Sequence, residues 1–235
     1  MAKSHLNTDN IIHLFMERIL NRHEGKRFWV CGSGGSLLDV IEKKIPKDDI
    51  IIACNSSTYH LKNPHYAVFT DETANHSQWF LKLAKSKRTQ IILLNPCIPS
   101  LKENTIYLEK DFNNWKFSKE DKKIIGGNDV IHCATHVAYM MGASEIILAG
   151  VDLKHVSATQ KHAHSQKLVD GAPIGLQQTL AESTKANDTL FDGHLGQSLS
   201  GWELILGKNH IKVRTIARDT YLKIVDFISF EDACN

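Results

Sequence analysis

Phe28–Leu37, FWVCGSGGSL, is the stretch of sequence that decides the fold of this chain. Four residues that suit a buried strand lead into small residues, and the chain then continues as a segment that can form a helix. At such a turn the backbone amides lie free of side chains, so a phosphate can bind them and the positive end of the helix. The turn predicts nucleotide binding. A glycine-rich turn without a ligand is the structural alternative.

The turn departs from two common nucleotide-binding patterns. Leu37 stands where dinucleotide-binding proteins carry a third glycine, and Asn55 follows the second expected strand, Ile50–Cys54, where those proteins carry an acidic residue. No Gly-Lys-Ser/Thr follows the glycines, so the P-loop pattern is also absent. Because an amide can still bond a ribose hydroxyl, the sequence favours a mononucleotide over NAD.

Composition indicates one folded domain. The chain has 235 residues, of which 42% are hydrophobic and 23% charged, and we expect a single nucleotide-binding domain over residues 1–235. A net charge of +2 does not by itself favour a nucleic-acid or membrane partner. The sequence shows neither a membrane-spanning run nor a signal peptide, so we expect a cytoplasmic protein. Five cysteines without a CxxC pair predict buried, reduced thiols.

The order of apolar segments predicts an α/β fold: a single Rossmann-like domain with a mainly parallel sheet, flanked by helices. An aperiodic segment rich in His, Lys, Ser and Gln, residues 154–171, is expected as a mobile loop over the site, with a solvated surface loop as the alternative. The expected helices are 9–22, 37–44, 129–141, 175–185 and 197–207, and the expected strands are 28–31, 50–54, 66–70, 91–94, 105–108, 145–152 and 211–216.

Four motifs in one order give the chain a family resemblance. They are the Gly32–Leu37 turn, a strand ending in Asn55, a helix and strand ending in Gly150-Val151-Asp152, and Gly193-His194 before the last helix and strand. Over residues 28–216 the chain resembles the bacterial lipooligosaccharide sialyltransferases that use CMP-sialic acid, and the related 6-hydroxymethylpterin diphosphokinase-like domains. The resemblance implies a Rossmann-like transferase.

The resemblance also implies site residues. Asn55 corresponds to a ribose or phosphate partner of the nucleotide, and Asp71 falls where the family places an Asn on the nucleotide. Asn128 and Asp129 fall where the family uses small hydroxyl residues to hold base and sugar, so the donor can differ from CMP-sialic acid. The residues implied to bind the nucleotide are Gly32, Ser33, Gly34, Gly35, Ser36, Asn55, Asp71, Asn128, Asp129, Gly150 and Asp152.

Sugar transfer requires a base for the acceptor hydroxyl and a group that stabilises the departing phosphate. His194, flanked by glycines and expected on a turn before a helix, is the candidate base, with a surface or capping histidine as the alternative. Lys154 stands where the related enzymes carry a tyrosine on the phosphate. It can neutralise phosphate charge, or it is a solvated loop cation.

Metal ligation is not expected. The sequence has no Asp-x-Asp pair of the kind that holds a divalent ion on a donor diphosphate. His155, His162 and His164 lack the spacing of a zinc site, so we interpret them as solvated loop residues. No cofactor is expected beyond the nucleotide-sugar donor.

These observations predict a metal-independent glycosyltransferase that uses a CMP-sugar or similar donor. The acceptor stays open among a glycan, a protein and a modified nucleic-acid base, and a homo-oligomer is compatible with the sequence. One alternative is a Mg-dependent diphosphate or phosphoryl transferase of the pterin-kinase-like type. The other is a nucleotide-binding module without catalysis.

Overall fold

The structure is a computed structural model that describes part of the chain. Several predictions made above therefore lie outside the described residues: Asp71, Asn128, Lys154, the loop 154–171, the helix 175–185 and most of the helix 9–22. The described residues are 17–70, 83, 88–94, 105–120, 123–127, 129–153 and 188–235, with the backbone alone described for 188–195.

The main sheet has eight strands in the order β10-β9-β8-β1-β2-β3-β4-β5, and every neighbouring pair is parallel. This confirms the predicted parallel α/β fold. The strands are β1 (Arg27–Cys31), β2 (Ile50–Cys54), β3 (Tyr66–Phe69), β4 (Gln90–Leu93), β5 (Thr105–Tyr107), β8 (Glu145–Ala149), β9 (Val213–Thr215) and β10 (Asp226–Phe227).

The strand order reverses beside β1. The chain moves outward from β1 through β2, β3, β4 and β5, and then returns to the other side of β1 with β8. Cys31 pairs with Ala149, so β1 and β8 end at the same level of the sheet. In open α/β sheets ligands bind outside the carboxyl ends of the strands at such a reversal point. The residues that follow β1 and β8 are therefore the candidate ligand-binding residues.

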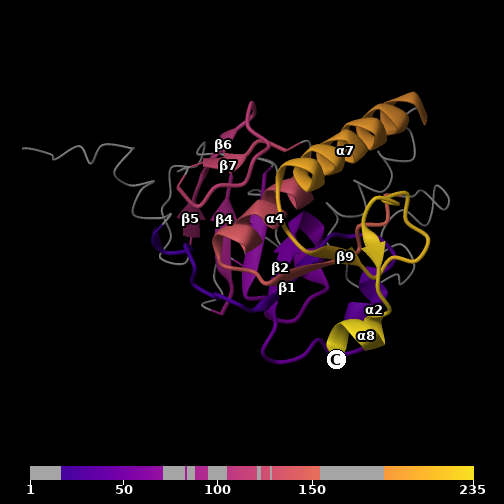
Figure 1. Ribbon diagram of the computed structural model, residues 1–235. Coiled ribbons are helices and arrows are strands. Elements are labelled where there is room, and N and C mark those ends of the chain that lie inside the picture. The colour runs from indigo at the N-terminus through magenta and orange to yellow at the C-terminus, as the bar shows by residue number, and fades with distance from the viewer. Residues whose placement is uncertain are drawn as a thin grey trace, which may run out of the picture.

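Helices cover both faces of the sheet (Figure 1). Phe28 and Val30 pack in one hydrophobic core with residues of α4 (Val130–Met140) and α7 (Asp188–Lys208). Trp29 and Cys31 point the other way and pack with α2 (Leu37–Glu42) and α8 (Phe230–Cys234). The alternation follows from the two-residue period of a strand, and burial on both faces explains why β1 is apolar from Phe28 to Cys31.

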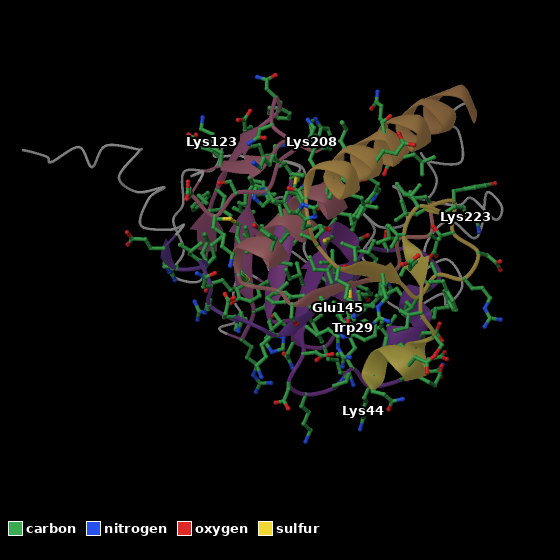
Figure 2. The ribbon with its side chains drawn as sticks, viewed as in Figure 1. Trp29, Lys44, Lys123, Glu145, Lys208 and Lys223 are labelled. Carbon is green, nitrogen blue, oxygen red and sulfur yellow. The ribbon has the colours of Figure 1, made fainter. Side chains whose placement is uncertain are left out.

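The side chains follow this layering. Figure 2 shows Trp29 and Glu145 within the body of the molecule, whereas Lys44, Lys123, Lys208 and Lys223 lie at its periphery. Among the described helices, none has both the length and the apolar character that a membrane span requires.

Several short elements were not predicted from the sequence. These elements are too short or too polar to give a periodic signal in the sequence. Lys123 and Glu109, for example, form an ion pair of 3.2 Å across two of these strands. The elements are β6 (Glu109–Asp111), which pairs in parallel with β7 (Lys123–Ile125), the 3-10 turn η1 (Asn55–Tyr59), β10 and α8.

The predicted helix 9–22 extends too far: Glu17 is helical, but residues 18–25 form turns. Asn21 and Gly25 have positive φ angles of 51° and 75°. The amides of Asn21 and Gly25 donate to the carbonyls of Met140 and Gly142 at the end of α4, both at 2.8 Å. Long-range hydrogen bonds thus replace helical ones here, which periodicity does not reveal.

Helix α7 begins at Asp188, nine residues before the predicted start at Gln197. Gly193 and Gly196 suggested a turn, because glycine in a helix costs about 1 kcal/mol relative to alanine. Packing of the later half of α7 on the protein core outweighs that propensity. The prediction that His194 lies on a turn is therefore wrong: position 194 lies within α7.

Candidate functional site

Gly32 and Gly150 bring the carboxyl ends of β1 and β8 into direct backbone contact. The Gly32 amide donates to the Ala149 carbonyl and the Gly34 amide to the Gly150 carbonyl, both at 2.8 Å. A Cβ on Gly32 would lie 2.5 Å from the Gly150 oxygen, and a Cβ on Gly150 would collide with the Gly32 oxygen. Gly150 also has a φ of +66°. Both positions require glycine because no side chain fits between the strands.

Ser36 and Asp152 lock this contact. The Ser36 amide donates to Asp152 Oδ2 at 2.9 Å, and the Ser36 hydroxyl donates to Asp152 Oδ1. The same hydroxyl accepts from the Gly150 amide at 2.8 Å. A Cβ on Gly34 would lie 2.6 Å from Asp152 Oδ2. The carboxylate thus rests directly on the glycine turn.

The expectation of a row of bare amides at this turn is wrong in part. The amides of Gly32, Gly34 and Ser36 already bond acceptors of the protein itself. Leu37, in the third glycine position, is fully buried, and its amide donates to the Gly34 carbonyl at 3.1 Å. The turn is therefore a closed structure capped by a carboxylate. The nucleotide contacts predicted for its residues stay predictions.

Asp152 is also held from the opposite side. Its carbonyl accepts from the Thr220 hydroxyl at 2.8 Å and from the Tyr221 amide at 3.2 Å. The next residue, Leu153, has a φ of 47°, a conformation that costs a side-chain-bearing residue roughly 1–3 kcal/mol. Hydrogen bonds on both sides maintain this strained backbone. The carboxylate is consequently fixed in place at the reversal point of the sheet.

Asn55 lies at the carboxyl end of β2, beside this arrangement. Its φ of 48° is left-handed, which asparagine tolerates better than most residues. Ser57 in η1 joins the ends of β1 and β2: its hydroxyl accepts from the Cys54 amide at 2.8 Å and donates to the Cys31 carbonyl at 2.7 Å. The left-handed backbone thus gives Asn55 a structural role at the end of β2. Ser57 was not predicted as a site residue.

Asp129 caps α4 next to the glycine turn. Asp129 Oδ1 accepts from the His132 amide at 2.9 Å, which is the usual geometry of an N-cap. The first turn of α4 reaches the turn after β1, since Ile131 Cδ1 lies 3.2 Å from where a Cβ on Gly32 would be. Asp129 Oδ2 accepts from the Ser198 hydroxyl of α7 at 2.6 Å. Ser198 was not predicted as a site residue.

His132 is buried beneath α7 and was also missed. Its ring makes edge contacts with Trp115 and Trp202, at centroid distances of 5.8 and 5.2 Å. Its Nε2 lies 3.6 Å from Asp129 Oδ2. Burial lowers the pKa of His132, and the Asp129 carboxylate opposes that shift. A Cβ on Gly201 would collide with this ring, so the glycine inside α7 is the sequence signal of the contact.

The thiols near the site are unsuited to nucleophilic chemistry. Burial raises the pKa of Cys31 and of Cys133 to about 12, and raises the pKa of Cys54 as well. Cys31, Cys54, Cys133 and Cys234 are free, as predicted, and Cys97 lies outside the described residues. Neutral buried thiols are inert.

Within the ranges that the structure describes, no three His, Cys, Asp or Glu side chains gather to hold a metal ion. His155, His162 and His164 lie outside those ranges.

Two solved structures share this fold. The sialyltransferase CstII from Campylobacter jejuni, in complex with the substrate analogue cytidine-5'-monophosphate, gives a TM-score of 0.52 at 15% identity, covering 88% of this chain and 86% of that chain. The sialyltransferase CST-II in complex with a trisaccharide acceptor and CMP gives a TM-score of 0.50 at 16% identity, covering 86% and 85%. At these identities the likeness shows the fold, and it confirms the resemblance to sialyltransferases at that level.

Sequence comparison identifies a family. No curated protein matches the sequence. The model of the family described as "6-hydroxymethylpterin diphosphokinase MptE-like" matches residues 4–157, which is more than half of the chain and contains the glycine turn, Asn55, Asp129 and Asp152. The chain belongs to the 6-hydroxymethylpterin diphosphokinase MptE-like family.

Proposed function

We propose that this protein is a glycosyltransferase that moves a sugar from a CMP-sugar or similar donor to a hydroxyl acceptor. One observation carries the proposal: the glycine turn, the Ser36–Asp152 pair, Asn55 and the Asp129 cap meet at the carboxyl edge of a parallel sheet, at its reversal point. That place is where such sheets bind nucleotides. The fold of a sialyltransferase solved with CMP, similar over 88% of this chain, supports it.

The proposed reaction is a displacement at the anomeric carbon of the donor sugar. The acceptor oxygen forms a bond to that carbon while the bond between the carbon and the phosphate oxygen breaks, and CMP departs with the bonding electrons. His194 takes the acceptor proton, because an imidazole is a suitable base near neutral pH. Lys154 offsets the charge of the departing phosphate.

The assignment of the base rests on the family resemblance. In the structure, position 194 lies within α7, one helical turn before Ser198, whose hydroxyl donates to the Asp129 carboxylate.

The test is CMP release from CMP-sialic acid with an oligosaccharide acceptor, measured with and without EDTA. We expect turnover that EDTA does not change, and a loss of about 10²–10⁴-fold in His194→Ala with nucleotide affinity retained. His210→Ala, at an exposed histidine just beyond α7, is the matched control and should stay active. Full activity in His194→Ala would show that another group is the base.

A second candidate function, Mg-dependent diphosphate transfer from ATP to a hydroxymethylpterin, is favoured by the family match. Carboxylate oxygens are the ligands that Mg²⁺ prefers. In the described part of the chain, Asp129 and Asp152 each accept one protein hydrogen bond per carboxylate oxygen, which leaves a lone pair on each oxygen for a metal ion. EDTA-sensitive release of AMP would select this function, and nucleotide binding without turnover would select a non-catalytic module.

A further inference from the structure

The segment 218–227, which follows β9, borders the candidate site. β9 is parallel to β8, with Thr215 opposite Leu148, so the chain beyond Thr215 emerges at the same edge of the sheet as residues 150–153. The segment then runs to β10, the strand at the edge of the sheet. Figure 2 shows Lys223 of this segment at the periphery of the molecule. The segment 218–227 therefore connects the reversal point of the sheet with the protein surface.

Hydrogen bonds fix the backbone of this segment on both sides of position 221. The Thr220 hydroxyl lies 3.1 and 2.8 Å from the carbonyl oxygens of Val151 and Asp152, and it accepts from the Leu222 amide at 3.0 Å. The Tyr221 amide donates to the Asp152 carbonyl at 3.2 Å. Leu222 is fully buried in the main hydrophobic core. Tyr221 is thus attached to a rigid support that is bonded to the residue closing the glycine turn.

Tyr221 is exposed although its neighbours in sequence are buried. It is 51% exposed, between Thr220 at 4% and Leu222 at 0%. A single exposed aromatic residue is ordinary on a protein surface. This one differs because its backbone is bonded to Asp152 at the reversal point, where open parallel sheets bind ligands. A ring on a fixed backbone loses little conformational freedom when a ligand stacks on it.

The charges of the segment 218–227 indicate which kind of ligand it suits. Two cations, Arg218 and Lys223, are balanced by two anions, Asp219 and Asp226. Nucleic acids and anionic membranes bind best to a surface of net positive charge, which this segment does not have. A sugar ring needs no net charge, because its C–H groups pack on the negative face of an aromatic ring. The tyrosine hydroxyl can also hydrogen-bond the sugar hydroxyls.

We infer that Tyr221 is a binding residue on which a sugar ring of an oligosaccharide acceptor stacks. Of the acceptor classes that the sequence left open, this selects a glycan over a protein or a modified nucleic-acid base. The inference rests on the proposed function insofar as the bound sugar is the acceptor. Tyr221 transfers no proton and forms no bond to the reacting atoms, so it acts on acceptor binding alone.

Kinetics separates acceptor binding from a structural role. We expect Tyr221→Ala to raise the acceptor KM about tenfold, with kcat and the donor KM unchanged. Hydrolysis of CMP-sialic acid without an acceptor should proceed as in the unaltered protein. Tyr221→Phe keeps the ring, so its acceptor KM should rise less than about threefold. Phe227→Ala removes an exposed ring of the same segment that lies on β10, and this matched control should keep the acceptor KM.

Two kinetic results would overturn the inference. An unchanged acceptor KM in Tyr221→Ala would show that the ring does not contact the acceptor, and the proposed function would still stand. A parallel loss of transfer and of donor hydrolysis in Tyr221→Ala would show that the residue supports the fold of the site instead.

A binding experiment tests the inference without turnover. Saturation-transfer NMR with CMP present and millimolar trisaccharides, one neutral and one sialylated, should give trisaccharide signals with the unaltered protein and with Tyr221→Phe. Tyr221→Ala should lose these signals. If it does while no CMP-sugar is turned over, the sugar site stands and the proposed function fails. No trisaccharide signal with the unaltered protein would overturn the inference. Tyr221-dependent binding of a single-stranded oligonucleotide or of phosphatidylglycerol vesicles instead would do the same.

Discussion

Ser36 and Asp152 lie 116 residues apart in sequence, yet both the amide and the hydroxyl of Ser36 donate to the Asp152 carboxylate. This pair closes the turn after β1 onto the end of β8. It also engages the Ser36 amide, which a bare turn would leave free to bind an anion.

Removal of the Asp152 side chain should loosen the turn. Asp152→Ala leaves two donors of Ser36 without their acceptor, so we expect a loss of about 1.5–3 kcal/mol in the free energy of unfolding. Asp152→Asn keeps one acceptor oxygen and should lose less. Urea denaturation measures both, with exposed Asp219→Ala as the control. Equal stability of the alanine variant and the control would contradict this account.

Gly32→Ala should destabilise the protein strongly. The new Cβ would lie 2.5 Å from the Gly150 carbonyl oxygen. The two glycines directly follow the adjacent parallel strands β1 and β8, which cannot separate without breaking the sheet. We expect a loss of at least about 2 kcal/mol, as for strain at a special backbone position.

Gly207→Ala is the contrasting change, because nothing lies within 4 Å of a Cβ there. It should stabilise α7 by roughly 0.5–1 kcal/mol. Thermal denaturation of the two variants, measured side by side, checks both signs. A neutral Gly32→Ala would show that β1 and β8 do not make the contact described.

Stability should fall as the pH is lowered through the titration of buried His136. Its Nδ1 accepts from the Ile125 amide at 3.0 Å, so the ring is neutral, and burial lowers its pKa from 6.5 to about 3. Below pH 6.5 the unfolded chain binds a proton that the folded protein does not. Stability is therefore full above about pH 6.5 and decreases toward pH 3, by about 2 kcal/mol at pH 5.

Urea denaturation at pH 7 and pH 5 measures this decrease. His136→Asn places an oxygen near the position of Nδ1 and cannot titrate. Between pH 7 and pH 5 the free energy of unfolding of this variant should therefore fall by about 2 kcal/mol less than that of the unaltered protein. Burial also lowers the pKa of His132, which adds a decrease of the same sign in both proteins. His210→Asn, at an exposed histidine, should behave like the unaltered protein.

Gly201→Ala should push α7 away from His132. A Cβ at position 201 would lie 3.0 Å from both ring nitrogens and closer still to Cε1, and the ring is enclosed by Trp115 and Trp202. We expect a loss of about 1–3 kcal/mol, as for overpacking of a core. In the background of His132→Ala the same change should cost much less. Equal costs in both backgrounds, measured by thermal denaturation, would disprove the contact.

The sequence alone was sufficient for the parallel α/β class and for most strands of the main sheet. Apolar runs such as Ile50–Cys54 and Glu145–Ala149 are nearly continuous because parallel strands are buried on both faces, so these strands can be recognised along the chain. Helix α4 was equally readable from its period and from Asp129 at its start. Glycine at positions 32 and 34 indicated a tight turn after the first strand, whereas the contact of Gly32 with Gly150 is known only from the structure.

Only the tertiary structure decided what those residues contact. The Ser36 amide donates to Asp152, and the Ser198 hydroxyl donates to Asp129. Periodicity and propensity are local properties of the chain, whereas these hydrogen bonds and contacts join segments about 70 to 116 residues apart. Their energies exist only once the sheet has brought the segments together.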